Sequence, residues 1–105
     1  MSDAPDHAAP VHRAPALTAR TRAALKARAH ALEPVVRIGH AGLTEGVVAD
    51  IARALEAHEL IKVKVGEGER EAREAMSTAI CDRTGAALVQ KVGRILVLWL
   101  PRPEE

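Results

Sequence analysis

The sequence predicts a two-layer-type α/β domain with a mixed four-stranded sheet, built in the order helix, strand, helix, strand, helix, strand, strand. Apolar residues recur at helical spacing in three segments. Runs rich in Val, Ile and Leu separate these segments, and glycines stand at several of the junctions. The chain of 105 residues is long enough for one domain with its own core.

The first helix is expected over residues 18–32, with Thr18 as its N-cap and Pro34 as the residue that stops it. Arg22 and Lys26 lie four residues apart on the side away from the apolar stripe, so both side chains are expected to face solvent. The stripe comprises Leu17, Leu25, Ala29 and Leu32.

A short β-branched strand is expected over residues 35–38. The turn at residues 39–43 then leads into a second helix that Thr44 can cap. Residues 60–65 alternate between apolar residues and lysines, which is typical of a half-buried strand. The buried face of the second helix is predicted to consist of Val47, Val48, Ile51, Ala54 and Leu55.

A third helix is expected after Gly66 and Gly68, which end the preceding strand. Acidic residues crowd its start, where they suit the positive end of the helix dipole, and Gly85 is expected to end it. Its inward face is predicted to consist of Ala72, Ala75, Met76, Ala79 and Ile80.

Residues 86–92 and 95–100 are expected to form a hairpin about Gly93 and Arg94. The last strand is apolar on both faces, so it should be central and covered on both sides, with the first helix as the second cover. The two strand-helix-strand passages should be right-handed crossovers that give parallel pairing, whereas the tight hairpin makes the last strand antiparallel to its neighbour.

Residues 1–16 hold three prolines without apolar periodicity, so we expect a flexible tail there, a domain over residues 17–101 and a short tail at 102–105. Cys81 is the single cysteine, which excludes an internal disulfide and suits the cytoplasm. A secretory signal is not recognisable, and no stretch approaches the length of about 18 uncharged apolar residues that a membrane span needs.

Charge is unevenly distributed although the net charge is only +1. Residues 12–40 hold six Arg or Lys and one acid, giving +5, whereas residues 41–80 hold eight acids and five bases, giving −3. This segregation suits an anion-binding face, and a solvated helix face is the alternative. Lys62 and Lys64 could extend such an anion-binding face, or they could simply form the solvent-exposed side of a strand. Trp99 is the only aromatic residue, so base stacking is not expected to contribute.

The turn Gly39-His40-Ala41-Gly42 could bind phosphate. A Gly-x-x-Gly turn between a strand and a helix allows close backbone approach and leaves amide groups near a helix N-terminus. Alternatively, the turn itself requires its glycines. The chain lacks Gly-Lys-Ser/Thr and Gly-x-Gly-x-x-Gly motifs, which argues against a mononucleotide cofactor.

Two segments carry a family resemblance, LEPVVRIGHAGLTEGV at residues 32–47 and HELIKVKV at residues 58–65. Thr-Gly-Ala at 84–86 and Val-Gly-Arg at 92–94 extend it, and it covers residues 17–101. The chain resembles YhbY-type members of the CRM (chloroplast RNA splicing and ribosome maturation) family. The resemblance implies a fold like the C-terminal domain of translation initiation factor three with an added helix. It also implies binding to ribosomal RNA precursors of the large subunit.

We call residues 39–42 the glycine loop. The resemblance implies that this loop contacts RNA, as the matching loop does in the family, and that basic residues support it. Two positions depart from the family pattern: Arg28 stands where an aliphatic residue is common, and Leu100 stands where a basic residue is expected. The candidate RNA-binding residues are Gly39, His40, Ala41, Gly42, Arg22, Lys26, Arg37, Thr44 and Arg94.

We expect no enzymatic activity, because His40 is a lone histidine without a carboxylate to orient it, which makes it a poor candidate for a general base. Neither a metal-ligand spacing nor a cofactor motif is present, so we expect no metal and no cofactor. From the loop and the resemblance we expect RNA as the partner of a monomer, without a membrane or small-molecule substrate. The rival hypothesis is a protein-interaction adaptor that acts through acidic helices. Its contact residues would be Glu45, Asp50, Glu56, Glu69 and Glu74.

Overall fold

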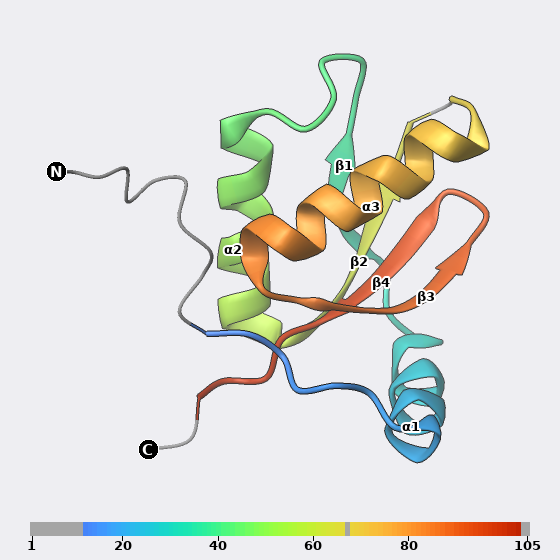
Figure 1. Cartoon of the computed structure of the whole chain (residues 1–105), viewed down its shortest axis with the longest axis vertical. Helices are drawn as coiled ribbons and strands as arrows, with labels where there is room; N and C mark the ends of the chain where they lie inside the picture. The colour runs from blue at the N-terminus through green and yellow to red at the C-terminus, as the bar shows by residue number, and fades with distance from the viewer. Residues whose placement is uncertain (1–11, 67, 104–105) are drawn as a thin grey trace, which may run out of the picture.

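The computed structural model describes residues 12–66 and 68–103. Three helices and four strands alternate as the sequence predicts, and together they form an α/β domain with a mixed sheet (Figure 1). None of the helices within these residues is long and apolar enough to cross a membrane. The elements are α1 (Ala19–Ala29), β1 (Pro34–Ile38), α2 (Glu45–His58), β2 (Leu60–Val65), α3 (Arg70–Thr84), β3 (Ala87–Val92) and β4 (Ile95–Trp99).

The sheet has the strand order β1-β2-β4-β3. β1 pairs with β2 in parallel, and β4 pairs with both β2 and β3 in antiparallel fashion. The last strand is therefore central and antiparallel to its hairpin partner, as predicted. The expected parallel pairing holds only for the first passage, because β4 lies between β2 and β3 and keeps those two strands from bonding directly.

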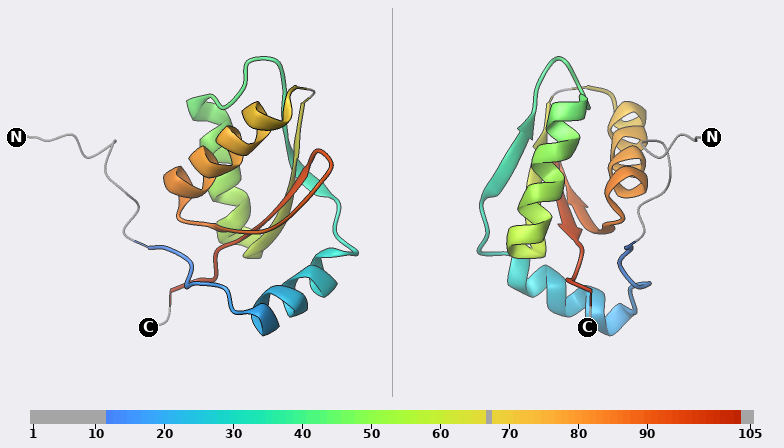
Figure 2. Two further views of the ribbon diagram at one scale, coloured as in Figure 1. Left: turned by 45° about the vertical axis from the view of Figure 1, so that its right-hand side comes forward. Right: turned by 90° about the vertical axis from the view of Figure 1, so that its left-hand side faces the viewer.

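Two apolar clusters cover the two faces of the sheet, which confirms that α1 is the second cover. α2 and α3 pack on one face, whereas α1 stands apart from them at one end of the sheet (Figure 2). β4 contributes to both clusters, since Leu96 and Leu98 face α2 and α3 while Val97 faces α1. The buried members of the α1 cluster are Leu25, Ala29, Leu60, Val89 and Val97.

The two predicted threonine caps are confirmed. Thr18 precedes α1 and accepts from the backbone N–H of Thr21, and Thr44 precedes α2 and accepts from that of Val47. Each bond satisfies an amide of the first helical turn that has no partner within the helix. α1 ends at Ala29, earlier than expected, and Leu32 beyond it is exposed.

The prediction for the inward face of α3 is partly wrong. Ala72 and Ala75 are exposed, whereas Ser77 and Thr84 are buried. Both buried hydroxyls form hydrogen bonds to backbone carbonyls of the same helix: Ser77 donates to the carbonyl of Glu74, and Thr84 donates to that of Ile80. A pattern search restricted to apolar residues misses such positions, because burial of a hydroxyl costs little once it is hydrogen-bonded.

Gly85 ends α3 in the left-handed conformation, with φ of 83°, as predicted for a glycine C-cap. The N-terminal segment lies directly against it, since the N–H of Ala14 donates to the Gly85 carbonyl at 2.8 Å. A Cβ atom at Gly85 would stand only 2.3 Å from the carbonyl oxygen of His12. Glycine is therefore required here both by its φ angle and by the close approach of a second backbone.

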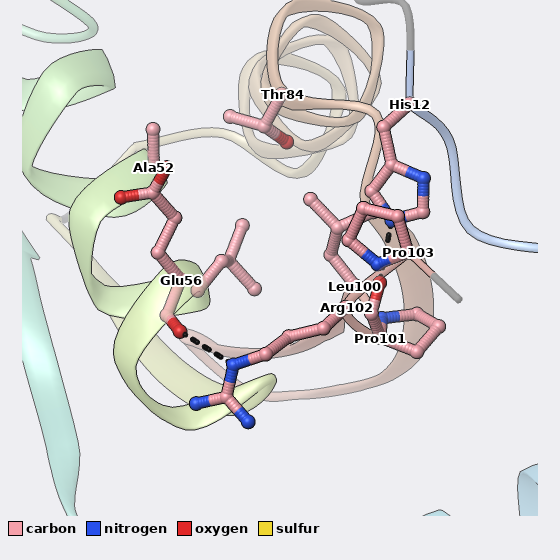
Figure 3. A pocket seen from close by; sticks show the side chains of 9 residues that line it. His12, Ala52, Glu56, Thr84, Leu100, Pro101, Arg102 and Pro103 are labelled. Atoms are coloured by element: carbon pink, nitrogen blue, oxygen red, sulfur yellow. Dashed lines mark hydrogen bonds between the residues drawn. The ribbon is translucent and has the colours of Figure 1, made fainter. Parts of the chain in front are cut away.

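His12 meets residues 100–103 beside the C-terminal half of α2 (Figure 3). His12 donates from Nε2 to the carbonyl of Pro101, and Arg102 donates to the carbonyls of Glu56 and Ala57. Residues 12–16 and 102–103, which the sequence analysis assigns to tails, thus lie on the domain. Residues 1–11, 104 and 105 of those tails lie outside the described residues, and the domain limits 17–101 stay a prediction.

Candidate nucleic-acid interface

The glycine loop joins β1 to α2 at the end of the domain opposite α1 (Figure 1). The Gly42 N–H donates to the Gly39 carbonyl and the Thr44 N–H donates to the Gly42 carbonyl, both at 3.0 Å. These bonds close a tight turn that leaves His40 and Ala41 exposed. The tip can therefore meet a ligand without rearrangement of the fold.

Only one of the two loop glycines is required by the backbone. Gly42 has φ of 77°, in the left-handed region, whereas Gly39 does not. A Cβ atom at Gly39 would meet nothing within 4 Å, so no neighbouring group excludes a side chain there. The turn thus accounts for Gly42 and leaves Gly39 unexplained, which favours close approach of a second backbone from outside.

A hollow of about 330 Å³ lies beside the loop and is lined in part by Gly39, His40 and Gly42. Gly66 and Gly68 beyond β2 line it together with Met76 and Arg73 of α3. Arg73 is half-buried and forms no ion pair within the described residues. Sequence analysis missed this cation, because it lies among acidic residues in the chain and reaches the loop only through the packing of α3.

Arg37 lies on β1, just before the loop, and its side chain is exposed. Its strand neighbours Val36 and Ile38 are buried against α2 and α3, so Arg37 projects from the opposite face. Arg94 lies in the β3–β4 turn, and its carbonyl accepts from the N–H of Val65 at 2.8 Å. Both residues are near the end of the sheet that carries the loop.

The expectation that the Arg22 side chain faces solvent is wrong. Its side chain is half-buried, and Nη1 donates to the carbonyls of Leu88 and Val89 at 3.0 and 2.6 Å. The register of β3 against β4 shifts between Leu88 and Gln90, a β-bulge, and Arg22 binds at this irregularity. Arg22 therefore connects α1 to the sheet, whereas Lys26 is exposed as expected.

The structure also separates residues that are close in sequence. α1, with Arg22 and Lys26, lies at one end of the sheet, and the glycine loop lies at the other (Figures 1 and 2). β1 carries the chain between them, and its five residues span about 17 Å at roughly 3.3 Å per residue. The predicted residues therefore form two groups at opposite ends of one sheet, and Arg37 and Arg94 belong to the group at the loop end.

We expect Arg22→Ala to lower the free energy of unfolding by about 2 kcal/mol, because two charge-assisted hydrogen bonds to partly buried carbonyls disappear. For a domain of this size the loss corresponds to a fall in Tm of roughly 10 °C. Circular dichroism during heating measures it. Lys26→Ala, at an exposed position of the same helix, is the matched control and should change stability by less than about 0.5 kcal/mol. An equal Tm for the two variants would contradict the hydrogen bonds from Arg22 to the carbonyls of β3.

The acidic residues of the adaptor hypothesis are largely paired. Glu45 bonds Arg83 at 2.7 Å, Asp50 bonds Arg53, and Glu74 contacts both Arg70 and Lys91. Such pairs leave less uncompensated negative charge on α2 and α3 than the sequence suggests. A basic protein partner would therefore find weaker electrostatic complementarity there.

Within residues 12–66 and 68–103, no group of three or more His, Cys, Asp or Glu residues could hold a metal ion. Burial raises the pKa of the Cys81 thiol, and the neighbouring carboxylate of Asp82 raises it further. The thiol therefore stays protonated at neutral pH, which makes it a poor nucleophile.

A family model described as the CRS1/YhbY (CRM) domain matches residues 17–99. The chain belongs to this CRM family. Among its relatives, an "RNA-binding protein" of Haemophilus influenzae is 50% identical over 88 residues, covering 84% of this chain and 89% of that protein. A "probable RNA-binding protein" of Pseudomonas aeruginosa is 39% identical over 89 residues, covering 85% and 86% respectively. The resemblance inferred from the sequence is confirmed.

The CRM fold is confirmed by a solved structure as well. The solution structure of hypothetical protein SAV1595 from Staphylococcus aureus superposes with a TM-score of 0.74 at 29% sequence identity. The match covers 85% of this chain and 93% of that one. Another relative, of Bacillus subtilis, also carries the name "probable RNA-binding protein" and is 35% identical over 83 residues, covering 79% of this chain and 86% of that protein.

Proposed function

We propose that this CRM domain binds structured RNA by contacting its phosphate backbone. The observation that carries the proposal is the exposed Gly39–Gly42 turn, whose first glycine the fold itself does not require. The names of the relatives support RNA as the ligand class. Backbone amides near the start of α2 and the cations Arg37 and Arg73 suit a phosphate at the loop.

Backbone recognition fits the residues better than reading of single-stranded bases. Trp99, the only aromatic residue, is half-buried in the cluster beneath α1 and offers no open stacking platform. Sequence-specific binding of splayed bases ordinarily uses exposed aromatic side chains. The domain therefore recognises the shape and charge of folded RNA, and its sequence preference is modest.

The natural ligand that we propose is a ribosomal RNA precursor during assembly of the large subunit. The family resemblance supports this choice. On the same basis we propose that the protein is a cytoplasmic monomer that binds RNA without catalysis. Thr44 and Arg94 remain candidate contacts beside the loop. Cross-linking in cells followed by sequencing of the attached RNA tests the proposal. Enrichment of large-subunit precursors is the expected result, and recovery of messenger RNA alone would contradict it.

Affinity should depend strongly on salt, because clustered cations displace counterions from the RNA. With about four phosphate contacts at roughly 0.7 to 0.9 each, the slope of log K against log salt concentration should be on the order of −3. Fluorescence anisotropy with a labelled RNA hairpin, measured from low to high salt, gives the slope. A slope near zero would exclude backbone contacts as the main source of affinity.

A further inference from the structure

α1 covers only part of its face of the sheet. Its cluster takes in Leu60, Val89 and Val97, together with the half-buried Trp99, which lie towards the α1 end of their strands. Val35 on the edge strand β1 and Val92 at the far end of β3 have no such cover, and they are 51% and 54% exposed. The structure thus leaves open a sheet surface that crosses all four strands.

Three cations stand on this uncovered surface. Ile61, Val63 and Val65 of β2 face α2 and α3, so the alternate residues Lys62 and Lys64 face the other way. The strand register continues the surface on both sides. It places Arg37 opposite Lys64, Lys64 opposite Ile95, and Ile95 opposite Val92. We call Val35, Arg37, Lys62, Lys64, Val92 and Ile95 the open sheet face.

The charges of this face are not compensated within the described residues. Arg37 and Lys64 form no ion pair there, and the ammonium of Lys62 meets only the carbonyl of Leu32. Glu33 apart, the described acids lie on α2 and α3 or immediately beside those helices. Arg37 and Lys64 also stand side by side on strands about 4.8 Å apart, where like charges repel. An external anion would relieve this repulsion.

The open sheet face connects the two groups of candidate residues. The glycine loop follows β1 directly, and Lys64 lies near the end of β2 on the same side of the molecule. At the other end, Arg28 of α1 lines a hollow with Val35, Leu60 and the acid Glu33, yet it has no ion-pair partner among the described residues. Cations therefore occur at both ends of the surface and along it.

We infer that the open sheet face is a second surface for the RNA backbone, so that one RNA runs from the glycine loop across the sheet to α1. The inference rests on the proposed function and extends it from a loop contact to a path along the domain. An RNA is the occupant that the charges favour, because three cations that form no ion pair among the described residues complement a row of phosphates. Val35, Val92 and Ile95 give sugars an apolar surface beside those cations.

Lysine footprinting tests this inference with an internal control. The chain has four lysines: two on the open sheet face, Lys26 on α1, and Lys91, which pairs with Glu74 of α3 on the opposite side. We expect saturation with an RNA hairpin of about 20 base pairs to slow acetylation of Lys62 and Lys64 at least threefold, with Lys91 unchanged. Acetylation of Lys64 at the same rate with and without bound RNA would overturn the inference.

A matched pair of variants gives an independent readout. Lys64→Gln should reduce the salt slope by about 0.7 to 0.9, the value of one phosphate contact. It should also weaken binding several-fold. Arg53→Gln removes one cation from α2, where Arg53 pairs with Asp50, and should leave the slope unchanged. An unchanged salt slope for Lys64→Gln would show that the RNA backbone does not contact the open sheet face at Lys64.

The outcomes separate this inference from the proposed function. If Asp substitutions in the loop prevent RNA binding while Lys64 is neither protected nor needed, the loop site stands and the sheet path is wrong. If the parental chain binds no structured RNA at low salt, both fail. If Lys64 becomes protected at high protein concentration without RNA, the face is a contact between copies of this chain, which also overturns the inference.

Discussion

Replacement of His40 and Ala41 together by aspartate is expected to abolish RNA binding while the fold is kept. Both side chains are exposed at the tip of the loop, so the substitutions remove no packing. Two carboxylates would stand where the proposal places phosphate, and juxtaposed like charges cost several kcal/mol. The affinity should fall by about 100-fold or more. Anisotropy with the RNA hairpin measures the loss, and circular dichroism checks the fold.

A second double variant controls for the change in net charge. Ala49 on α2 and Ala75 on α3 are exposed, so Ala49→Asp with Ala75→Asp adds the same two charges away from the loop. Its affinity should fall only slightly, by the long-range effect of charge. Comparable loss in both double variants would show that overall charge, and not the loop, controls binding.

Gly85→Ala is expected to lower the free energy of unfolding by about 3 kcal/mol. The φ angle of 83° costs a residue with a Cβ atom about 1 to 2 kcal/mol. The new Cβ would also stand 2.3 Å from the His12 carbonyl oxygen, which forces the N-terminal segment away. Its hydrogen bond from Ala14 would then be lost, at about 1 kcal/mol. Chemical or thermal unfolding measures the change.

Gly42→Ala separates the two parts of this cost. Gly42 has nearly the same φ, 77°, but its Cβ would have nothing within 4 Å. The substitution should therefore cost only about 1 kcal/mol, from the backbone conformation alone. If both alanine variants lose the same stability, residues 12–14 do not pack on Gly85 in solution.

Sequence signals predicted the features that depend on neighbours in the chain. The caps at Thr18 and Thr44, the alternation of β2 and the glycine end of α3 each follow from a hydrogen bond or a φ angle within a few residues. The central place of β4 was also predictable, because a strand that is apolar on both faces needs cover on both.

Tertiary contacts decided the remaining features. Arg22 reaches carbonyls that lie 66 and 67 residues further along the chain, and helical periodicity holds no information about them. Arg73 lies beside the loop only because α3 packs there. In the sequence it stands among acidic residues, so the charge pattern does not indicate it as part of a basic site. The loop and α1 are close along the chain, yet an extended strand separates them in space because it advances more than twice as far per residue as a helix does.

The contact of Arg22 with β3 also bears on self-association. β3 has a strand on one side only, and an open strand edge can template pairing with another chain. The bulge in β3 interrupts the regular hydrogen-bonding pattern of the strand. The guanidinium of Arg22 donates to two carbonyls beside the bulge, so these carbonyls already have a partner. The opposite edge strand, β1, is only five residues long and begins with Pro34, which has no N–H to donate. Both borders of the sheet are therefore poor templates for a further strand, which protects a domain with exposed valines from aggregation at high concentration.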